Sequence, residues 1–180
     1  ARIISALRTF YKYLLFEDLI TVDPTEMLES PKVGRKLPDF LSSGEVEKII
    51  DAVDMSKDEG HRNRAIMETL YGSGLRVSEL TNLRISDLFF KQDIIRVTGK
   101  GDKERLVPIN GMAQKHITIY REEVRVHQTP AKGHEDFVFL NRRGKQLTRA
   151  MIFHIVKTLT IAAGIKKSVS PHTFRHSFAT

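Results

Sequence analysis

Two short β-branched runs interrupt a chain whose other apolar positions recur at helical spacing. The runs are residues 94–98 (IIRVT) and 105–109 (RLVPI), and the glycine-containing segment GKGDKE joins them. Strand-like runs separated by so short a turn predict an antiparallel hairpin. Since this hairpin is the main β signal, the sequence predicts a mainly α fold with a small antiparallel β-sheet, in the α+β class.

Helical patterns with clear end signals lie on both sides of the hairpin. Ser42 and Glu45 form a capping box, and glycines end several of the patterns. The expected helices cover about 45–54, 61–72, 75–79, 112–126 and 149–163, and a last one begins at Ser170-Pro171. One further short strand is expected at 137–140.

A segment rich in proline and basic residues, SPKVGRKLP at 30–38, has the composition of a linker. We expect residues 1–30 to be the end of a helical domain, 31–41 an interdomain linker and 42–180 a second domain. Thirty residues are too few for an independent core. Neither the first nor the last helical pattern has an outer capping signal, so we expect the chain to be an inner part of a longer protein.

The net charge of the chain is +7, from 29 Lys and Arg against 22 Asp and Glu. Residues 111–180 carry 12 basic and 4 acidic side chains, a balance of +8, whereas residues 37–110 carry 11 and 13, a balance of −2. A basic segment suits a polyanionic partner, although many solvated proteins are basic for no specific reason.

Composition also excludes several classes of protein. The chain has no cysteine, which rules out disulfide scaffolds, thiolate zinc sites and iron–sulfur clusters within it and fits a cytoplasmic protein. No apolar run approaches the roughly 18 residues that a membrane helix needs. We therefore expect no membrane association.

His172 and Arg175 lie three residues apart in the first turn of the last predicted helix, on one face. An imidazole, a guanidinium and the unpaired N–H groups of a helix start together favour an anion such as phosphate. The alternative is that His172 packs and Arg175 is solvated or ion-paired. We expect His176 to lie on another face and to be structural.

Arg76 and Lys100 each follow or adjoin glycines that allow close backbone approach. Arg76 follows the turn in YGSGLRVSEL, and an i,i+3 salt bridge to Glu79 would explain it without any function. Lys100 lies between two glycines at the hairpin turn, where it is suited to deliver a proton to a leaving group or is simply solvated. Lys103 and Arg105 are nearby competitors for the role of Lys100.

Three separated strings, GSGLRVSEL, VTGKGDKERLVPI and SPHTFRHSFAT, occur in this order along the chain. Together they resemble the catalytic domain of the tyrosine recombinases, most closely the Xer type of bacterial site-specific recombinase. The segments ALRTFYKYLL and DPTEMLESPK are similar to the end of that family's helical core-binding domain. The resemblance covers nearly the whole chain.

The resemblance implies a role for each candidate residue. Arg76 matches the first catalytic arginine, Lys100 the hairpin lysine, and His172 with Arg175 the His-x-x-Arg pair; Arg76, His172 and Arg175 would hold the phosphate. In that family a tyrosine attacks a DNA phosphate to leave a 3′-phosphotyrosyl link, without metal or other cofactor. The partners it implies are double-stranded DNA and further protomers, which form a tetramer on two duplexes.

The family's nucleophilic tyrosine lies beyond its His-x-x-Arg helix, so none of the four tyrosines here is expected to be the nucleophile: Tyr11, Tyr13, Tyr71 and Tyr120. We expect the 180 residues alone to be inactive in cleavage. Two alternatives stay open, a non-catalytic DNA-binding protein on the same fold and a type IB topoisomerase. The target sequence, and the choice between chromosome dimer resolution and mobile-element integration, also stay open.

Overall fold

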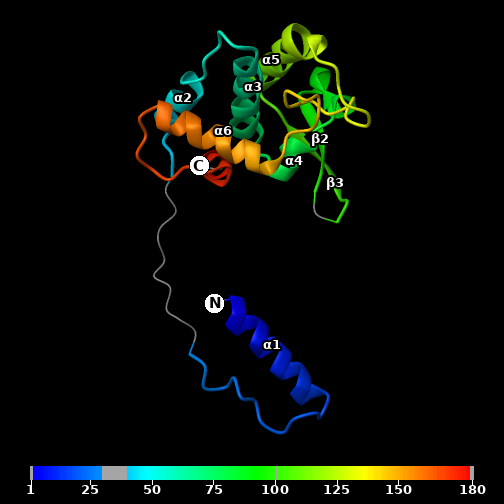
Figure 1. Cartoon of the computed structure of the whole chain (residues 1–180), viewed down its shortest axis with the longest axis vertical. Helices are drawn as coiled ribbons and strands as arrows, with labels where there is room; N and C mark the ends of the chain where they lie inside the picture. The colour runs from blue at the N-terminus through cyan, green and yellow to red at the C-terminus, as the bar shows by residue number, and fades with distance from the viewer. Residues whose placement is uncertain (1, 30–39, 100, 179–180) are drawn as a thin grey trace. The chain divides into compact units, whose positions relative to one another are not determined.

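The computed structural model describes residues 2–29, 40–99 and 101–178. The chain forms two compact units, Ala1–Leu37 and Pro38–Thr180 (Figure 1). Most of the predicted linker, residues 31–41, lies outside the described residues, so the predicted division at 31–41 stays a prediction. In the described part of the chain, no helix combines the length and apolar character needed to cross a membrane.

The first unit is built on helix α1, Arg2–Phe16. Asp18 adopts a left-handed conformation (φ 53°), and the amides of Asp18 and Leu19 donate to the carbonyls of Leu15 and Leu14 at 3.2 and 2.9 Å. This pattern is a Schellman motif, which satisfies carbonyls that the helix end leaves unpaired. The next segment turns at Asp23, whose carboxylate accepts hydrogen bonds from the amide and hydroxyl of Thr25.

The second unit begins with two helices, α2 (Ser43–Asp51) and α3 (Asp58–Ser73). The predicted capping box is confirmed: the Ser42 amide donates to Glu45 Oε2 at 2.8 Å, and the Glu45 amide donates to Ser42 Oγ at 3.3 Å. Helix α3 is buried along most of its length and contacts α2, α4, α5 and α7. It therefore forms the centre of the unit, as Figure 1 shows.

The sheet has three antiparallel strands in the order β1-β2-β3. The predicted hairpin is confirmed as β2 (Ile94–Thr98) and β3 (Glu104–Pro108), with Arg96 opposite Leu106. Strand β1 (Leu88–Phe89) was not predicted and lies between the short 3₁₀ turns η1 (Ile85–Asp87) and η2 (Phe90–Gln92). Its two residues are too few to show an alternating pattern.

Helix α5 (Gly111–Ile119) continues as a π-helical turn η3 (Tyr120–Val124) and a 3₁₀ turn η4 (Arg125–His127). The predicted strand at 137–140 is wrong, because this segment makes only isolated bridges, Arg84 with Phe137 and Leu140 with Gln146. Its apolar side chains are nevertheless needed in the core, where Val138, Phe139 and Leu140 are buried.

Two helices complete the second unit, α6 (Arg149–Ala162) and α7 (Pro171–Phe178). Thr148 caps α6 by accepting a hydrogen bond from the Met151 amide, and Ser170 accepts one from the Thr173 amide at the start of α7. The structure is thus mostly helical with one small antiparallel sheet, and the predicted fold class is confirmed. Helices α4 and α7, which carry candidate residues, each contact both α3 and α6.

Candidate functional site

Arg76 stands at the junction between α3 and the short helix α4, Val77–Thr81. Gly74 ends α3 in a left-handed conformation (φ 57°), and the adjacent Leu75 is buried. Arg76 Nη1 donates to Glu79 Oε1 at 2.8 Å, the salt bridge that a purely structural role predicts. The Arg76 side chain is still 54% exposed, and a guanidinium has five N–H groups, so this salt bridge leaves donors available for an anion.

Glu79 is a buried carboxylate shared by two arginines. Its side chain has no exposed area; Oε2 accepts from the Arg76 amide at 2.8 Å and from Arg105 Nη2 at 2.9 Å. Burial by itself would raise the pKa of Glu79, but the hydrogen bonds from Arg76 and Arg105 outweigh it and hold the pKa below its ordinary value. The ionised carboxylate therefore fixes Arg76 of α4 beside Arg105 of strand β3.

Lys100 lies outside the described residues, but both sides of its turn are described. The Gly99 amide donates to the Lys103 carbonyl at 2.8 Å, and Gly101 has a φ of 76°. A Cβ atom built on Gly99 would lie 3.7 Å from Glu79 Oε1. The base of the turn is therefore close to the carboxylate that holds Arg76 and Arg105.

His172 and Arg175 both lie on α7, which is anchored by the fully buried ring of Phe174. His172 is exposed and Arg175 is half-buried. Arg175 Nη1 is buried and has no hydrogen-bond partner among the residues that the structure describes. Leaving a buried charged donor unpaired costs about 1–3 kcal/mol or more, so this atom is suited to an acceptor supplied by a ligand.

The expectation for the face of His176 was wrong. The rings of His172 and His176 stack with centroids 6.3 Å apart. At 3.6 residues per turn, residues four apart share a helix face, so the two imidazoles lie together.

The structure brings the elements that carry Arg76 and the α7 pair to the same two helices. Both α4 and α7 contact α3, and both contact α6. Among the described residues, no hydrogen bond or ion pair joins Arg76 to His172 or Arg175. The candidates are thus carried by elements that pack against the same two helices, and no described bond joins Arg76 to the α7 pair.

The sequence analysis missed the joint role of Glu79 and Arg105. Strand alternation was the available signal: Arg105 is two residues from the buried Val107, so both project from the same side of β3. Tyr120, by contrast, is fully buried, and its hydroxyl accepts a hydrogen bond from the Leu140 amide at 3.3 Å. Burial raises the pKa of Tyr120, which agrees with a structural role.

Comparison with known proteins gives the class to which this fold and these motifs belong. The family model described as "Phage integrase family" matches residues 39–180, and the chain belongs to this family. Tyrosine recombinase XerD of Oceanobacillus iheyensis is 42% identical over all 180 residues, and so is XerD of Staphylococcus aureus. The chain spans 60% and 61% of the length of these two relatives.

Solved structures agree with this assignment. The XerA recombinase is 32% identical, with a TM-score of 0.70 over 98% of this chain and 58% of that one. The XerH recombinase in a post-cleavage complex with its palindromic difH substrate is 30% identical, with a TM-score of 0.70 over 82% of this chain and 42% of that one. A lambda integrase dimer bound to a core site is 18% identical with a TM-score of 0.74 over 98% of this chain and 63% of that one, and it shares the fold.

Proposed function

We propose that this chain belongs to a site-specific DNA recombinase that cuts and rejoins DNA through a 3′-phosphotyrosyl intermediate. The observation that carries the proposal is the buried, unpartnered Nη1 of Arg175 on the His-x-x-Arg helix. The XerD relatives and the DNA-bound XerH complex support it. The proposed domain assignment is a catalytic domain over 42–180, preceded by the end of a core-binding domain over 1–30.

The proposed chemistry is the transfer of a DNA phosphoryl group from the 5′-oxygen to a tyrosine oxygen. A tyrosine oxygen attacks the phosphorus while the bond to the 5′-oxygen breaks, and Arg76 and Arg175 neutralise the charge that gathers on the nonbridging oxygens. Lys100 protonates the departing 5′-oxygen, and His172 hydrogen-bonds the phosphate or accepts the tyrosine proton. From the resemblance we infer that the nucleophilic tyrosine of the whole protein lies C-terminal to α7.

Double-stranded DNA and further recombinase protomers, assembled as a tetramer on two duplexes, are the proposed partners. The proposed location is the cytoplasm, where bacterial DNA is found. The basic balance of residues 111–180 and the complex of XerH with its difH substrate support the choice of DNA as partner.

The proposal is tested with the full-length product of the gene on a nicked suicide substrate, which traps covalent protein on DNA. A 3′-phosphotyrosyl adduct is expected, followed by strand exchange between two sites. Tight DNA binding without any adduct would favour a non-catalytic DNA-binding protein. Adduct formation with relaxation of supercoils but no strand exchange would favour a type IB topoisomerase.

A further inference from the structure

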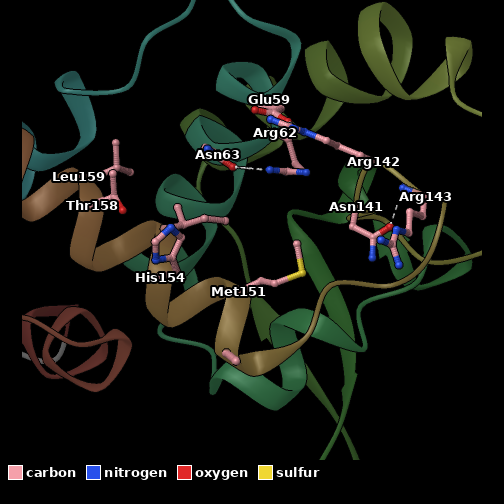
Figure 2. Close-up of a pocket in the computed structure, with 12 residues that line it drawn as sticks. Glu59, Arg62, Asn63, Asn141, Arg142, Arg143, Met151, His154, Thr158 and Leu159 are labelled. Atoms are coloured by element: carbon pink, nitrogen blue, oxygen red, sulfur yellow. Dashed lines mark hydrogen bonds and ion pairs between the residues drawn. The ribbon is translucent and has the colours of Figure 1, made fainter.

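A cavity of about 810 Å³ opens between the first half of α3, α6 and the loop at 141–143 (Figure 2). Its lining combines cationic side chains with apolar ones. None of the proposed catalytic residues lines it, and α4 and α7 contribute nothing to it. It is therefore a feature separate from the candidate phosphate site.

Arg62, which lines this cavity, is a buried cation that donates its described hydrogen bonds to neutral groups. It is only 7% exposed. Its guanidinium donates to the Leu140 carbonyl at 3.1 Å and to Asn63 Oδ1 at 3.2 and 3.0 Å. Glu59 attracts it electrostatically, but no hydrogen bond or ion pair between the two is among those of the described residues. Burial lowers the pKa of Arg62. A buried charge is costly unless an opposite charge accompanies it, so the site is suited to an incoming anion.

The one acidic side chain at this cavity is already paired. Glu59 forms an ion pair with Arg142, seen at the top of Figure 2. Arg143 next to it is exposed, and its turn is fixed because Asn141 Oδ1 accepts hydrogen bonds from the amides of Arg143 and Lys145 at 2.8 and 3.1 Å. Glu59 also attracts Arg62 electrostatically, so a single carboxylate faces three arginines, Arg62, Arg142 and Arg143, and the lining keeps an excess of positive charge.

The α6 side of the cavity is mostly apolar. Met151, Ile155 and Leu159 follow one another at four-residue spacing along the helix, so they form one stripe on the cavity wall. Met151 is half-buried, whereas Ile155 and Leu159 also pack into the core and are only 9% and 8% exposed. An amphipathic helix commonly docks its apolar face on a stripe of this kind. A phosphodiester backbone offers mostly charged oxygens and small sugar carbons, so it covers such a stripe less well than the apolar side chains of a protein segment do.

We propose that this cavity is a docking site for an acidic amphipathic segment of a partner protein. Carboxylates of the segment pair with Arg62 and Arg143, and its apolar side chains cover the stripe of Met151, Ile155 and Leu159. The positive charge of the lining requires a negatively charged partner segment, and the apolar stripe requires that the segment be amphipathic. The proposal does not depend on the recombinase chemistry.

The test uses a labelled alanine-rich peptide of about 20 residues that carries leucines at i, i+3, i+4 and i+7 on one face and four glutamates spaced apart on the flanks of that face, so that helix formation is favoured. Its binding to the whole chain is measured by fluorescence anisotropy beside a peptide with lysine in place of every glutamate. The acidic peptide is expected to bind and the basic one is not. Arg143→Glu should weaken binding about tenfold or more, whereas Lys157→Glu, an exposed α6 residue outside the lining, should leave it unchanged.

Arg62→Met should abolish most of the affinity for the acidic peptide. Arg62 is buried, so its replacement can prevent folding; in that case Arg143→Glu, at an exposed residue, still tests the proposal. Equal binding of both peptides, or of neither, would overturn the proposal. Three further results would overturn the proposal. They are displacement of the acidic peptide by a short DNA duplex, self-association of the chain that Arg143→Glu abolishes, and loss of peptide binding in the full-length gene product. Those three results would assign the cavity to DNA, to a second copy or to another segment of the same protein. Because the assay contains no cleavage step, its failure is distinct from failure of the recombinase proposal.

Discussion

Glu79 fixes two arginines from different elements with one carboxylate. Its side chain is completely buried, while its partners Arg76 and Arg105 are 54% and 43% exposed. Each guanidinium therefore gives some N–H groups to Glu79 and keeps others toward solvent. An i,i+3 salt bridge and a phosphate-binding role are thus compatible for Arg76.

Replacement of Glu79 by glutamine should reduce the free energy of unfolding by about 1–3 kcal/mol at neutral pH, because charged hydrogen bonds are lost. The folded state lowers the pKa of Glu79, so its stabilising effect is present above the unfolded carboxyl pKa and is lost as pH falls through the folded value. The difference between wild type and Glu79→Gln should therefore shrink in acid. Urea unfolding at several pH values checks this, with Glu47→Gln on the exposed face of α2 as the control. A difference that stays constant with pH would contradict it.

Arg175 has the opposite environment, because its buried Nη1 has no hydrogen-bond partner among the described residues. Because the unpaired charge costs free energy, Arg175→Met should leave the free energy of unfolding unchanged within about 1 kcal/mol or raise it. Thermal unfolding of the two proteins gives the comparison. A loss of more than about 2 kcal/mol would mean that Arg175 has a structural partner.

Among the helices and strands, the sequence predicted correctly those features whose bonds join residues close together along the chain. The Ser42–Glu45 capping box and the hairpin were found because their bonds join residues close in sequence. The segment 137–140 was taken for a strand because its residues are apolar, but burial against the core, rather than strand pairing, accounts for them. The π-helical turn at Tyr120–Val124 has no pattern distinct from an α-helix.

In the candidate site too, local contacts could be predicted from the sequence and long-range contacts could not. His172 and Arg175 could be paired from their spacing on one helix, and Arg76 with Glu79 from theirs. The Glu79–Arg105 ion pair joins residues 26 apart, and the packing of α4 and α7 against α3 and α6 is equally long-range. No spacing rule reaches such contacts. The orphaned Nη1 of Arg175 depends on packing and cannot be read from sequence at all.

The hairpin is the element on which the proposed acid depends. If Lys100 protonates the leaving oxygen, Lys100→Ala in the full-length gene product should cleave an ordinary site poorly but a 5′-phosphorothiolate site nearly normally, since sulfur leaves without protonation. Adduct yields on the two substrates give the result. Lys103→Ala is the matched control. If the 5′-phosphorothiolate site does not restore cleavage by Lys100→Ala, or restores it for Lys103→Ala instead, Lys100 is not the acid.

Charge is distributed unevenly over the whole molecule. Residues 111–180 carry the +8 excess, while Arg76 and Lys100 lie in a stretch of net −2. In the proposed recombinase, binding of the DNA backbone and action on one phosphate are therefore assigned to different parts of the chain. The basic segment is proposed for the first and the individually placed cations for the second.

Binding of a DNA duplex to the chain should weaken steeply with salt, because counterions are released from the phosphates. The expected slope of log K against log salt is about −0.9 for each phosphate neutralised. A salt titration followed by fluorescence anisotropy measures it. An affinity independent of salt would contradict a backbone contact by the basic segment.

The central claim is that Arg76 and Arg175 act on one phosphate and contribute little to the grip on DNA. The most direct test compares covalent adduct yield and DNA affinity for Arg76→Ala and Arg175→Ala in the full-length gene product, with Arg84→Ala as an exposed arginine control. Each site variant should lose adduct formation by about 100-fold or more, as loss of a transition-state donor does, while its affinity changes only slightly. A near-normal adduct yield in either variant, or a loss of adduct that merely follows a loss of binding, would contradict the claim.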